Sequence, residues 1–469
     1  MKIEQIYTGC LAQGAYYIES NGEVAIIDPL RETKPYIEKA DKEGAKIKYI
    51  FETHFHADFV SGHVSLAEQT GAKIIFGPTA QTNYDTIVAE DGQVFQLGDV
   101  TIKVLYTPGH TQESSSFLLI DENGKENALF SGDTLFIGDV GRPDLAVKSD
   151  LTKEDLASML FDSLRDKIMT LPDELIVYPA HGAGSACGKN MSKETFDTLA
   201  HQKEVNYALR SDMTREEFIK EVTDGLGTPP SYFPQNVKMN KEGYENFDVV
   251  LKRGTVGLNP SEFEEIVNSK GALMLDTRAP QTFKKAFVPN SINIGIDGGF
   301  APWVGALIID LKQPIVVITD EGREEEVITR LARVGYDNTL GYLKGGIDAW
   351  QLAGNEVDQI ESISASELDK RMTGNIDILD ARANSEFLSE HINDRRVINY
   401  PLDTINENYG ELDKGKEYTI HCAGGYRSMI TASILKARGF NRIVDVAGGF
   451  KGIKEEGINI TEFVCPTTL

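Results

Sequence analysis

The sequence predicts an α/β protein built of consecutive domains, and three observations support this fold class. Apolar runs rich in β-branched residues, such as residues 47–51, have the character of buried strands and end in short polar segments. The second half of the chain repeats one unit of strand-like and helix-like runs. A chain of 469 residues is also too long for a single core, since cores larger than about 250–300 residues usually split.

The first element of interest is the segment Thr53-His54-Phe55-His56-Ala57-Asp58-Phe59, which follows the strand-like run 47–51. Imidazole and carboxylate groups bind Zn, Fe and Mn, and loops at strand ends are common places for such sites. A lone His-x-His pair is weak evidence, because solvated or core histidines also occur in pairs. Three later strand-like runs end in comparable segments, which are Thr107-Pro108-Gly109-His110, Ser131-Gly132-Asp133 and Tyr178-Pro179-Ala180-His181.

Together these four segments resemble the metallo-β-lactamase superfamily over roughly residues 1–245. The resemblance implies an αββα sandwich with the metal at one edge. Binuclear members, such as the β-lactamases and glyoxalase II, usually extend the first motif to His-x-His-x-Asp-His, whose last His helps to hold a second metal. Here that position is Phe59, which cannot bind a metal, so a binuclear zinc hydrolase is disfavoured.

The remaining groups suit one metal ion. The resemblance to the persulfide dioxygenases of this superfamily implies that His54, His110 and Asp133 hold one Fe(II) per chain. Two His and one carboxylate on one face, with open positions opposite, are typical of non-haem Fe(II) oxygenases, and the open positions would admit a persulfide and O₂. The groups expected to orient ligands or hold water are His56, Asp58 and His181.

Two further residues near these motifs have two interpretations each. Arg142 lies in the run Gly138 to Asp144, which also resembles the persulfide dioxygenases, and it is either a substrate-binding cation or half of a structural pair with Asp144. Cys187 follows His181 in a stretch that resembles bacterial persulfide dioxygenases with fused rhodanese domains. It either lines the same cleft or is a buried inert thiol, since free Cys is often buried.

The second informative element is a cysteine loop near the C-terminus. A strand-like run, 418–421, leads into Cys422, and a helix-like run, 429–436, follows a Gly-rich loop. Backbone N–H groups of such a loop, the helix N-terminus and Arg427 all favour the thiolate, which is the nucleophilic form. The Cys-x-x-Gly-x-Arg pattern resembles the active loop of rhodaneses, whose sulfur cradle here would include Ala423, Gly424, Gly425, Tyr426 and Ser428.

Spacing in this loop favours sulfur over phosphate. Tyrosine phosphatases use Cys-x₅-Arg, whereas Arg427 follows Cys422 by one residue fewer. The shorter cradle suits a single sulfur atom rather than a tetrahedral phosphate. A structural cysteine beside an unrelated Arg is the alternative, which the ordered sequence of strand, Gly loop, Arg and helix makes less attractive.

An internal repeat supports two tandem rhodanese-like α/β domains. Leu275-Asp276-Thr277-Arg278 recurs 104 residues later as Leu379-Asp380-Ala381-Arg382, and Gly345-Gly346 recurs as Gly448-Gly449. Aligning Gly322 with Gly425 puts Thr319 at the place of Cys422 and Glu324 at the place of Arg427. A hydroxyl cannot carry a sulfane sulfur, so we expect the first copy to be inactive and to serve as a spacer or packing partner.

The repeat and the motifs suggest three domains, at residues 1–245, 246–357 and 358–469. The stretch Gly227 to Gly254 contains Pro229-Pro230 and Pro234 and has weak periodicity, so it is interpreted as a linker. Four Cys do not make a disulfide framework, and Cys10 and Cys465 receive no role.

Composition predicts a soluble, cytoplasmic protein. Hydrophobic residues make up 41% of the chain, and neither a secretory leader nor an apolar stretch of about 18 residues is evident, so we expect no membrane association. The net charge of −25 argues against nucleic acid, whose phosphates need basic patches. In so acidic a chain, Arg142 and Arg427 are the cations expected to attract sulfur anions.

These observations predict an iron-dependent persulfide dioxygenase joined to a thiosulfate sulfurtransferase and acting in sulfide detoxification. A low-molecular-weight thiol persulfide, O₂ and water would give thiol and sulfite, and Cys422 would pass a sulfane sulfur to sulfite to form thiosulfate, or catalyse the reverse. The resemblance also implies a homo-oligomer. Two alternatives remain, a binuclear zinc thioester hydrolase of the glyoxalase II kind fused to a sulfurtransferase, and a non-enzymatic persulfide sensor that uses Cys422 and Cys187.

Overall fold

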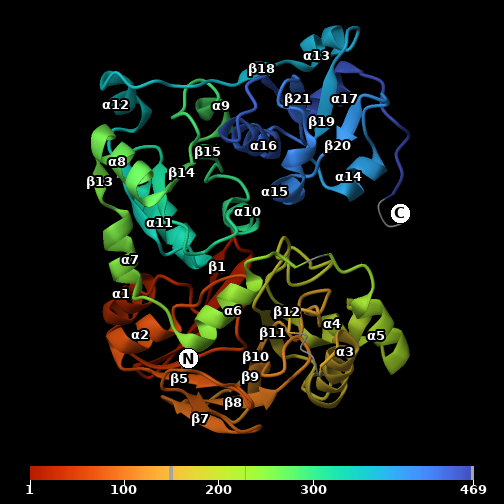
Figure 1. Cartoon of the computed structure of the whole chain (residues 1–469). Helices are drawn as coiled ribbons and strands as arrows, with labels where there is room; N and C mark the ends of the chain where they lie inside the picture. The colour runs from red at the N-terminus through yellow and green to blue at the C-terminus, as the bar shows by residue number, and fades with distance from the viewer. Residues whose placement is uncertain (147–150, 228, 466–469) are drawn as a thin grey trace. The chain divides into compact units, whose positions relative to one another are not determined.

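The computed structural model describes residues 1–146, 151–227 and 229–465, which divide into two compact units (Figure 1). The first unit contains Met1–Phe247 with Ala332–Gly335, and the second contains the other described residues. Each unit has its own sheets and its own hydrophobic core. The three domain boundaries expected from the sequence remain predictions.

The described part of the first unit contains two mixed sheets of six strands each, packed face to face. The first sheet has the order β1-β2-β3-β4-β5-β6 and the second β12-β11-β10-β9-β8-β7. The strands are β1 (Lys2–Thr8), β2 (Gln13–Ser20), β3 (Glu23–Ile27), β4 (Lys46–Phe51), β5 (Lys73–Phe76), β6 (Ile87–Val88), β7 (Val94–Leu97), β8 (Val100–Tyr106), β9 (Ser115–Ile120), β10 (Glu126–Gly132), β11 (Ile176–Pro179) and β12 (Asp197–Thr198).

Alternation along the strands produces the layers of this unit. On β10, Ala128 and Phe130 face the core between the sheets, whereas Leu129 faces the helices outside the second sheet. The outer helices cover both sandwich faces, which confirms the predicted αββα arrangement (Figure 1). They are α1 (Lys34–Glu43) and α2 (His63–Thr70) on the first sheet, and α3 (Lys153–Asp162), α4 (Leu199–Val205) and α5 (Arg215–Thr223) on the second.

The expected linker, Gly227 to Gly254, is wrong for most of its length. It contains two helices, α6 (Phe233–Glu242) and α7 (Phe247–Gly254). Pro234 lies in the first turn of α6, where a missing N–H costs nothing because that N–H would have no helical partner. Pro234 therefore lies at the start of a helix rather than interrupting one, and Pro229 and Pro230 precede that helix.

The second unit repeats one topology. Its described residues form two parallel sheets of five strands, ordered β13-β17-β16-β14-β15 and β18-β22-β21-β19-β20, which confirms two tandem α/β copies. The strands are β13 (Gly257–Leu258), β14 (Leu273–Asp276), β15 (Ile292–Asn293), β16 (Ile315–Ile318), β17 (Thr339–Leu343), β18 (Glu361–Ile363), β19 (Asp377–Asp380), β20 (Val397–Asn399), β21 (Tyr418–His421) and β22 (Ile443–Val446).

Helices connect the parallel strands in both copies. In each copy, the helix after the first strand begins with a capping box, formed by Asn259 and Glu262 in the first copy and by Ser364 and Glu367 in the second. The helices are α8 (Pro260–Lys270), α9 (Pro280–Phe283), α10 (Phe300–Leu307), α11 (Glu324–Arg333), α12 (Gly346–Leu352), α13 (Ala365–Arg371), α14 (Asn384–Ser389), α15 (Ile405–Asn408), α16 (Tyr426–Ala437) and α17 (Gly449–Glu456).

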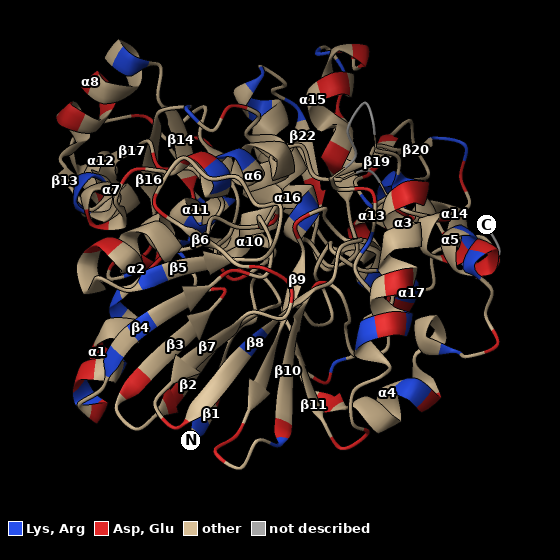
Figure 2. Cartoon of the chain, turned by 90° about the horizontal axis from the view of Figure 1, so that it is seen from below, with Lys and Arg blue, Asp and Glu red and all other residues tan. Residues whose placement is uncertain are grey.

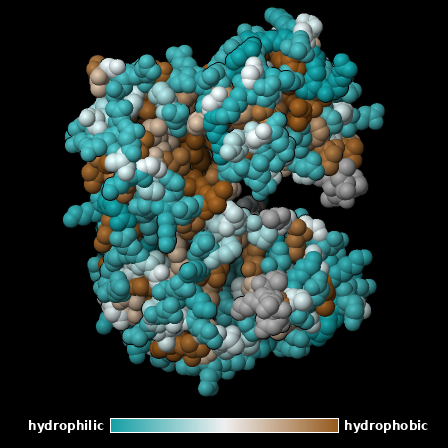
Figure 3. Space-filling model, viewed as in Figure 1, coloured by the Kyte–Doolittle hydropathy of each residue, from teal (hydrophilic) through white to brown (hydrophobic). Residues whose placement is uncertain are grey.

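The surface carries both charged and hydrophobic residues, as the composition indicates. Figure 2 shows acidic and basic residues interspersed along the helices, and the face seen in Figure 3 is mostly hydrophilic with hydrophobic patches among polar residues. Across the described residues, no helix combines the length and apolarity that crossing a bilayer would need.

Candidate functional site

The four motif segments meet because the strands before them end at one edge of the sandwich. In the second sheet, β8 and β10 both run antiparallel to β9, and β11 runs parallel to β10, so all three end on the same side. They lead into His110, Asp133 and His181, while β4 of the first sheet leads into His54. The loops after these strands thus carry buried polar groups to one place.

Three of these groups converge on one point. The Nε2 atoms of His110 and His54 lie 3.3 and 3.9 Å from Oδ2 of Asp133. All three side chains are buried. Ligands about 2.1 Å from a common ion lie roughly 3–4 Å from each other, so the distances suit a shared metal.

The surroundings of the triad fit a metal as well. Among the described residues, neither carboxylate oxygen of Asp133 has a hydrogen-bond partner, although both are buried. Such a group is costly unless something unseen satisfies it. His110 Nδ1 lies 2.9 Å from the carbonyl oxygen of Arg142, so donation from Nδ1 leaves Nε2 free as a ligand. Burial and the neighbouring histidines lower the pKa of His54 well below its usual value, which favours the neutral, ligating imidazole.

A second group lies beside the triad. His181 Nε2 is 3.5 Å from Asp58 Oδ2 and 3.7 Å from Asp133 Oδ1. The ring centroid of His56 lies 4.2 Å from that of His54 and 4.4 Å from that of Phe59, and the His56 and Phe59 rings are tilted by 33°. Phe59 therefore packs against His56 and offers no metal ligand to this second group.

His56 is held between carboxylates that the sequence motifs did not include. Its Nε2 lies 3.1 Å from Asp28 Oδ1 and 3.6 Å from Glu52 Oε2. Burial by itself favours the neutral ring, but Asp28 and the other nearby carboxylates raise the pKa of His56 to about 9. Asp28 also accepts hydrogen bonds from the backbone N–H and the hydroxyl of Thr53, both at 2.8 Å. These two hydrogen bonds fix the start of the loop that follows β4 and contains His54, which we call the metal-site loop.

A residue of the supposed linker also holds this loop. Asn240 on α6 donates to the carbonyl oxygens of His56 and Phe59, both at 2.8 Å, and accepts from the N–H of Ser61 at 2.9 Å. Its side chain is buried. One amide thus satisfies three backbone groups in a loop that has no regular secondary structure.

The structure favours the structural interpretation of Arg142. Its guanidinium donates to both carboxylate oxygens of Asp144, at 2.6 and 2.7 Å, and to the carbonyl oxygens of Ala186 and Gly227. These bonds occupy the cation, so its link to the site is the carbonyl that faces His110.

Cys187 lies in the site region. Its thiol, with Asp133 and His181, forms a further cluster of possible metal ligands. Burial, Asp58 and Asp133 raise the pKa of the Cys187 thiol well above its usual value. These surroundings favour the thiol over the thiolate, and both interpretations of Cys187 remain predictions.

The cysteine loop has the strand–loop–helix geometry that its sequence predicts. Cys422 follows β21, and its Sγ accepts a hydrogen bond from the N–H of Gly425 at 3.1 Å. Gly425 has φ = 102°, a value that favours glycine, and it caps α16. The thiol also contacts Ser428 Oγ at 3.7 Å, and Ser428 in turn donates to Asp445 at 2.7 Å.

Arg427 is paired rather than free. Its guanidinium donates to both oxygens of Glu386 on α14, at 2.5 and 2.9 Å. The same pairing lowers the pKa of Glu386 and raises that of Arg427, so both are charged. The loop thus has less net positive charge than the sequence alone indicates.

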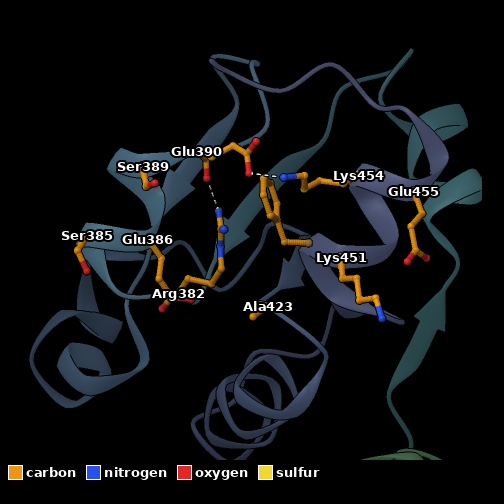
Figure 4. A pocket seen from close by; sticks show the side chains of 10 residues that line it. Arg382, Ser385, Glu386, Ser389, Glu390, Ala423, Lys451, Lys454 and Glu455 are labelled. Atoms are coloured by element: carbon orange, nitrogen blue, oxygen red, sulfur yellow. Dashed lines mark hydrogen bonds and ion pairs between the residues drawn. The ribbon is translucent and has the colours of Figure 1, made fainter. Parts of the chain in front are cut away.

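An open groove of about 620 Å³ lies beside the loop (Figure 4). Residues of α14 line one wall, residues of α17 line the other, and Ala423 of the loop lies between them. The first turn of α17 is joined to the loop, since the N–H groups of Phe450 and Lys451 donate to the carbonyl oxygens of Cys422 and Ala423. The groove is lined by Arg382, Ser385, Glu386, Ser389, Glu390, Ala423, Phe450, Lys451, Lys454 and Glu455.

Comparison with known proteins identifies both halves of the chain. A family model described as the Metallo-beta-lactamase superfamily matches residues 8–181, and one described as Rhodanese-like domain matches residues 259–353 and 364–456. The human protein named Persulfide dioxygenase ETHE1, mitochondrial is 30% identical over 200 residues, which is 42% of this chain and 70% of that protein. The chain belongs to the metallo-beta-lactamase superfamily. Two rhodanese-like domains follow its superfamily domain.

Two other similar proteins match different lengths of this chain. Hydroxyacylglutathione hydrolase of Rhizobium etli is 38% identical over 164 residues, 34% of this chain, and the chain spans only 57% of that protein's length. A crystal structure described as a metallo-beta-lactamase from Staphylococcus aureus is 32% identical with a TM-score of 0.64, and the match covers 73% of this chain and 98% of that one.

In the first rhodanese-like copy, a threonine stands where the second copy has its cysteine, as the alignment of Gly322 with Gly425 predicts. Thr319 directly follows β16, as Cys422 follows β21, and Gly322 has a φ of 85°. Arg278 pairs with Asp276 in the first copy as Arg382 pairs with Asp380 in the second.

Several site residues were not found from the sequence. Asp28 had a usable signal, because it ends the strand-like run 24–27 in the same way that the metal motifs end theirs. Asn240 and Glu386 had none, since their partners are distant in the chain.

Proposed function

We propose that the chain oxidises low-molecular-weight persulfides to sulfite at one iron in its superfamily domain and transfers sulfane sulfur through Cys422. The observation that carries the proposal is the convergence of His54, His110 and Asp133 beside a second position where Phe59 packs on His56. A single two-His, one-carboxylate site is typical of non-haem Fe(II) oxygenases. The persulfide dioxygenase among the similar proteins agrees with this reading.

His54, His110 and Asp133 would hold the ion. When bound, Fe(II) would supply adjacent open positions at which persulfide sulfur and O₂ can react. The protein's own contribution is to present neutral imidazole nitrogens, through the Nδ1 contacts of His110 with Arg142 and of His54 with Thr53, and to keep the site dry. The balanced reaction is RSSH + O₂ + H₂O giving RSH, sulfite and two protons.

At the second site, the Cys422 thiolate would attack the outer sulfur of a persulfide. The S–S bond of the donor breaks, the thiolate RS⁻ leaves, and Cys422 becomes a persulfide. Attack by sulfite on that sulfur releases thiosulfate and regenerates the thiolate. The N–H of Gly425 is placed to stabilise negative charge on sulfur, and the groove beside Ala423 offers the approach. The reverse direction uses the same steps.

A binuclear zinc thioester hydrolase is the second candidate for the superfamily domain. His56, Asp58 and His181 also lie close enough to share an ion, and Asp133 lies near both groups. The similarity to a hydroxyacylglutathione hydrolase favours the same candidate. It would need two metals held with one fewer His than usual.

Metal content and oxygen uptake separate these candidates. The purified chain is loaded with Fe(II) anaerobically, and O₂ uptake and sulfite are then measured with glutathione, coenzyme A and cysteine persulfides. One iron per chain with sulfite formed per O₂ is the expected result. Two zinc per chain with hydrolysis of acyl-glutathione thioesters, and no O₂ uptake, would overturn the proposal.

A further inference from the structure

We infer that the first rhodanese-like copy positions the cysteine loop of the second copy, and that Tyr426 is the positioning residue. The inference rests on the proposed sulfur transfer at Cys422. It gives the copy that lacks a cysteine a role in the reaction beyond that of a spacer.

Tyr426 joins the loop to the first copy. It is the first residue of α16 and follows Gly425, whose N–H bonds Cys422 Sγ at 3.1 Å. Its side chain leaves the sulfur cradle and donates from its hydroxyl to the carbonyl oxygen of Gly295 at 2.6 Å. The ring also lies over Gly298, where an added Cβ would be 2.2 Å from a ring carbon. The space for the ring therefore exists only because residue 298 has no side chain.

The first copy holds the receiving segment, residues 293–298, from its own side. Arg323 donates to both carboxylate oxygens of Asp297, at 2.9 and 2.8 Å, and Arg330 donates to the carbonyl oxygen of Ile296 at 2.6 Å. Asn293 donates from its side chain to the carbonyl oxygens of Asp276 and Arg278. These contacts hold the segment against which the ring of Tyr426 packs, so they oppose a shift of the ring.

The cysteine-free loop itself provides part of that support. Arg323 occupies the place in the first copy that Tyr426 occupies in the second, as the alignment of Gly322 with Gly425 shows. In the second copy, Tyr426 at this position contacts residues 295 and 298. In the first copy, Arg323 at this position binds Asp297, which lies between those two residues. The loop of the first copy that corresponds to the sulfur cradle thus supports the sulfur cradle of the second copy.

A second contact fixes α16 further along its length. The backbone N–H of Asn293 donates to Ser433 Oγ at 2.9 Å, and Ser433 is fully buried. With Tyr426 at the first residue of the helix and Ser433 two turns later, both the position and the rotation of α16 are set. Because Gly425 caps this helix, its N–H is aimed at Cys422 through the same contacts.

The test removes or crowds the ring and measures thiosulfate:cyanide sulfurtransferase activity of the full chain. Gly298→Ala should lower kcat by roughly tenfold or more while changing KM little, because small misplacements of reacting groups cost up to about a hundredfold. Tyr426→Ala should show a comparable loss. Tyr426→Phe, which keeps the ring and loses the hydroxyl bond to Gly295, should show a smaller loss than Tyr426→Ala. Gly410→Ala is the matched control, because no atom lies within 4 Å of its added Cβ.

The double variant decides between positioning and general damage. If the methyl at residue 298 acts through the ring, adding Gly298→Ala to Tyr426→Ala should have no further effect. Additive losses, or wild-type kcat in Gly298→Ala, would overturn the inference. The rate at which iodoacetamide alkylates Cys422 is measured in parallel, with the expected fall in Gly298→Ala. That readout tests the positioning even if the wild-type chain lacks sulfurtransferase activity, in which case the proposed function fails instead.

Discussion

At the residue scale, the reactive groups of this chain work through partners that lie elsewhere in the sequence. Arg427 stands beside the cradle, yet its charge is shared with Glu386 on a different helix. His110 presents Nε2 to Asp133 because Nδ1 faces a backbone carbonyl from another loop. In both cases the chemistry of a motif residue depends on a contact that the motif does not contain.

Cys422→Ser should separate the two proposed activities. A serine hydroxyl cannot form a persulfide, so enzymatic formation of thiosulfate should vanish while O₂ uptake and sulfite formation persist. The measurement is sulfite and thiosulfate by chromatography during persulfide oxidation. Unchanged enzymatic thiosulfate in this variant would mean that sulfur bypasses the loop, with Cys187 the first residue to examine.

Glu386→Gln should strengthen binding of thiosulfate. Removing the carboxylate leaves the Arg427 charge unpaired, and KM should fall by up to about fivefold, since a partly exposed pair is worth about 0.2–1 kcal/mol. Glu390→Gln is the matched control, because it removes the same charge from the same groove but pairs with Lys454. An equal fall of KM in both variants would mean that the groove responds to charge in general rather than to Arg427.

At the scale of helices and strands, the sequence was informative where candidate functional residues lie directly after a predicted strand. Strands β4, β8, β10 and β11 were expected from apolar runs, and their following loops do bring His54, His110, Asp133 and His181 together. The failure was the helix α6, because Pro229, Pro230 and Pro234 suggested a linker. Periodicity there is weak since the helix buries only a narrow face, which includes Phe233, Asn236 and Asn240.

Asn240→Ala should weaken the metal-site loop. It leaves the carbonyls of His56 and Phe59 and the N–H of Ser61 without their partner, and each such buried loss costs about 1–3 kcal/mol. We expect a lower melting temperature and faster loss of bound iron to a chelator. Gln235→Ala, an exposed position on the same helix, should change neither quantity. Normal iron retention in Asn240→Ala would show that the loop holds its shape without α6.

Restoring a cysteine to the first copy should not restore chemistry. In Cys422→Ser carrying Thr319→Cys, the new thiol would have Asp320, Glu321 and Glu324 where the second copy has Ala423, Gly424 and Arg427. Nearby carboxylates disfavour a thiolate and repel thiosulfate, and a helix N-terminus offsets only about 0.3–1 kcal/mol. Appreciable thiosulfate:cyanide turnover in this variant would show that the first copy is still competent.

At the scale of the whole molecule, the chain separates its two proposed chemistries into different compact units. The metal-site residues belong to the unit of Met1–Phe247, and Cys422 belongs to the other. From the sequence, the repeat, the motifs and the length predicted three domains, and those boundaries stay a prediction. The support that the first rhodanese-like copy gives to α16 was not predictable, because it depends on the absence of a side chain at Gly298, which has no periodic signal.

This separation predicts that damage to one site leaves the other intact. His110→Ala or Asp133→Ala should abolish iron binding and O₂ uptake, because two remaining protein ligands are too few to hold a labile ferrous ion. Thiosulfate:cyanide sulfurtransferase activity should stay at the wild-type level, since Cys422 lies in a unit with its own core. His201→Ala, which removes an exposed imidazole paired with Asp197, is the control for loss of a histidine in the same unit. Full O₂ uptake by either ligand variant would remove the mononuclear assignment, and loss of sulfurtransferase activity would show that the two units fold or act as one.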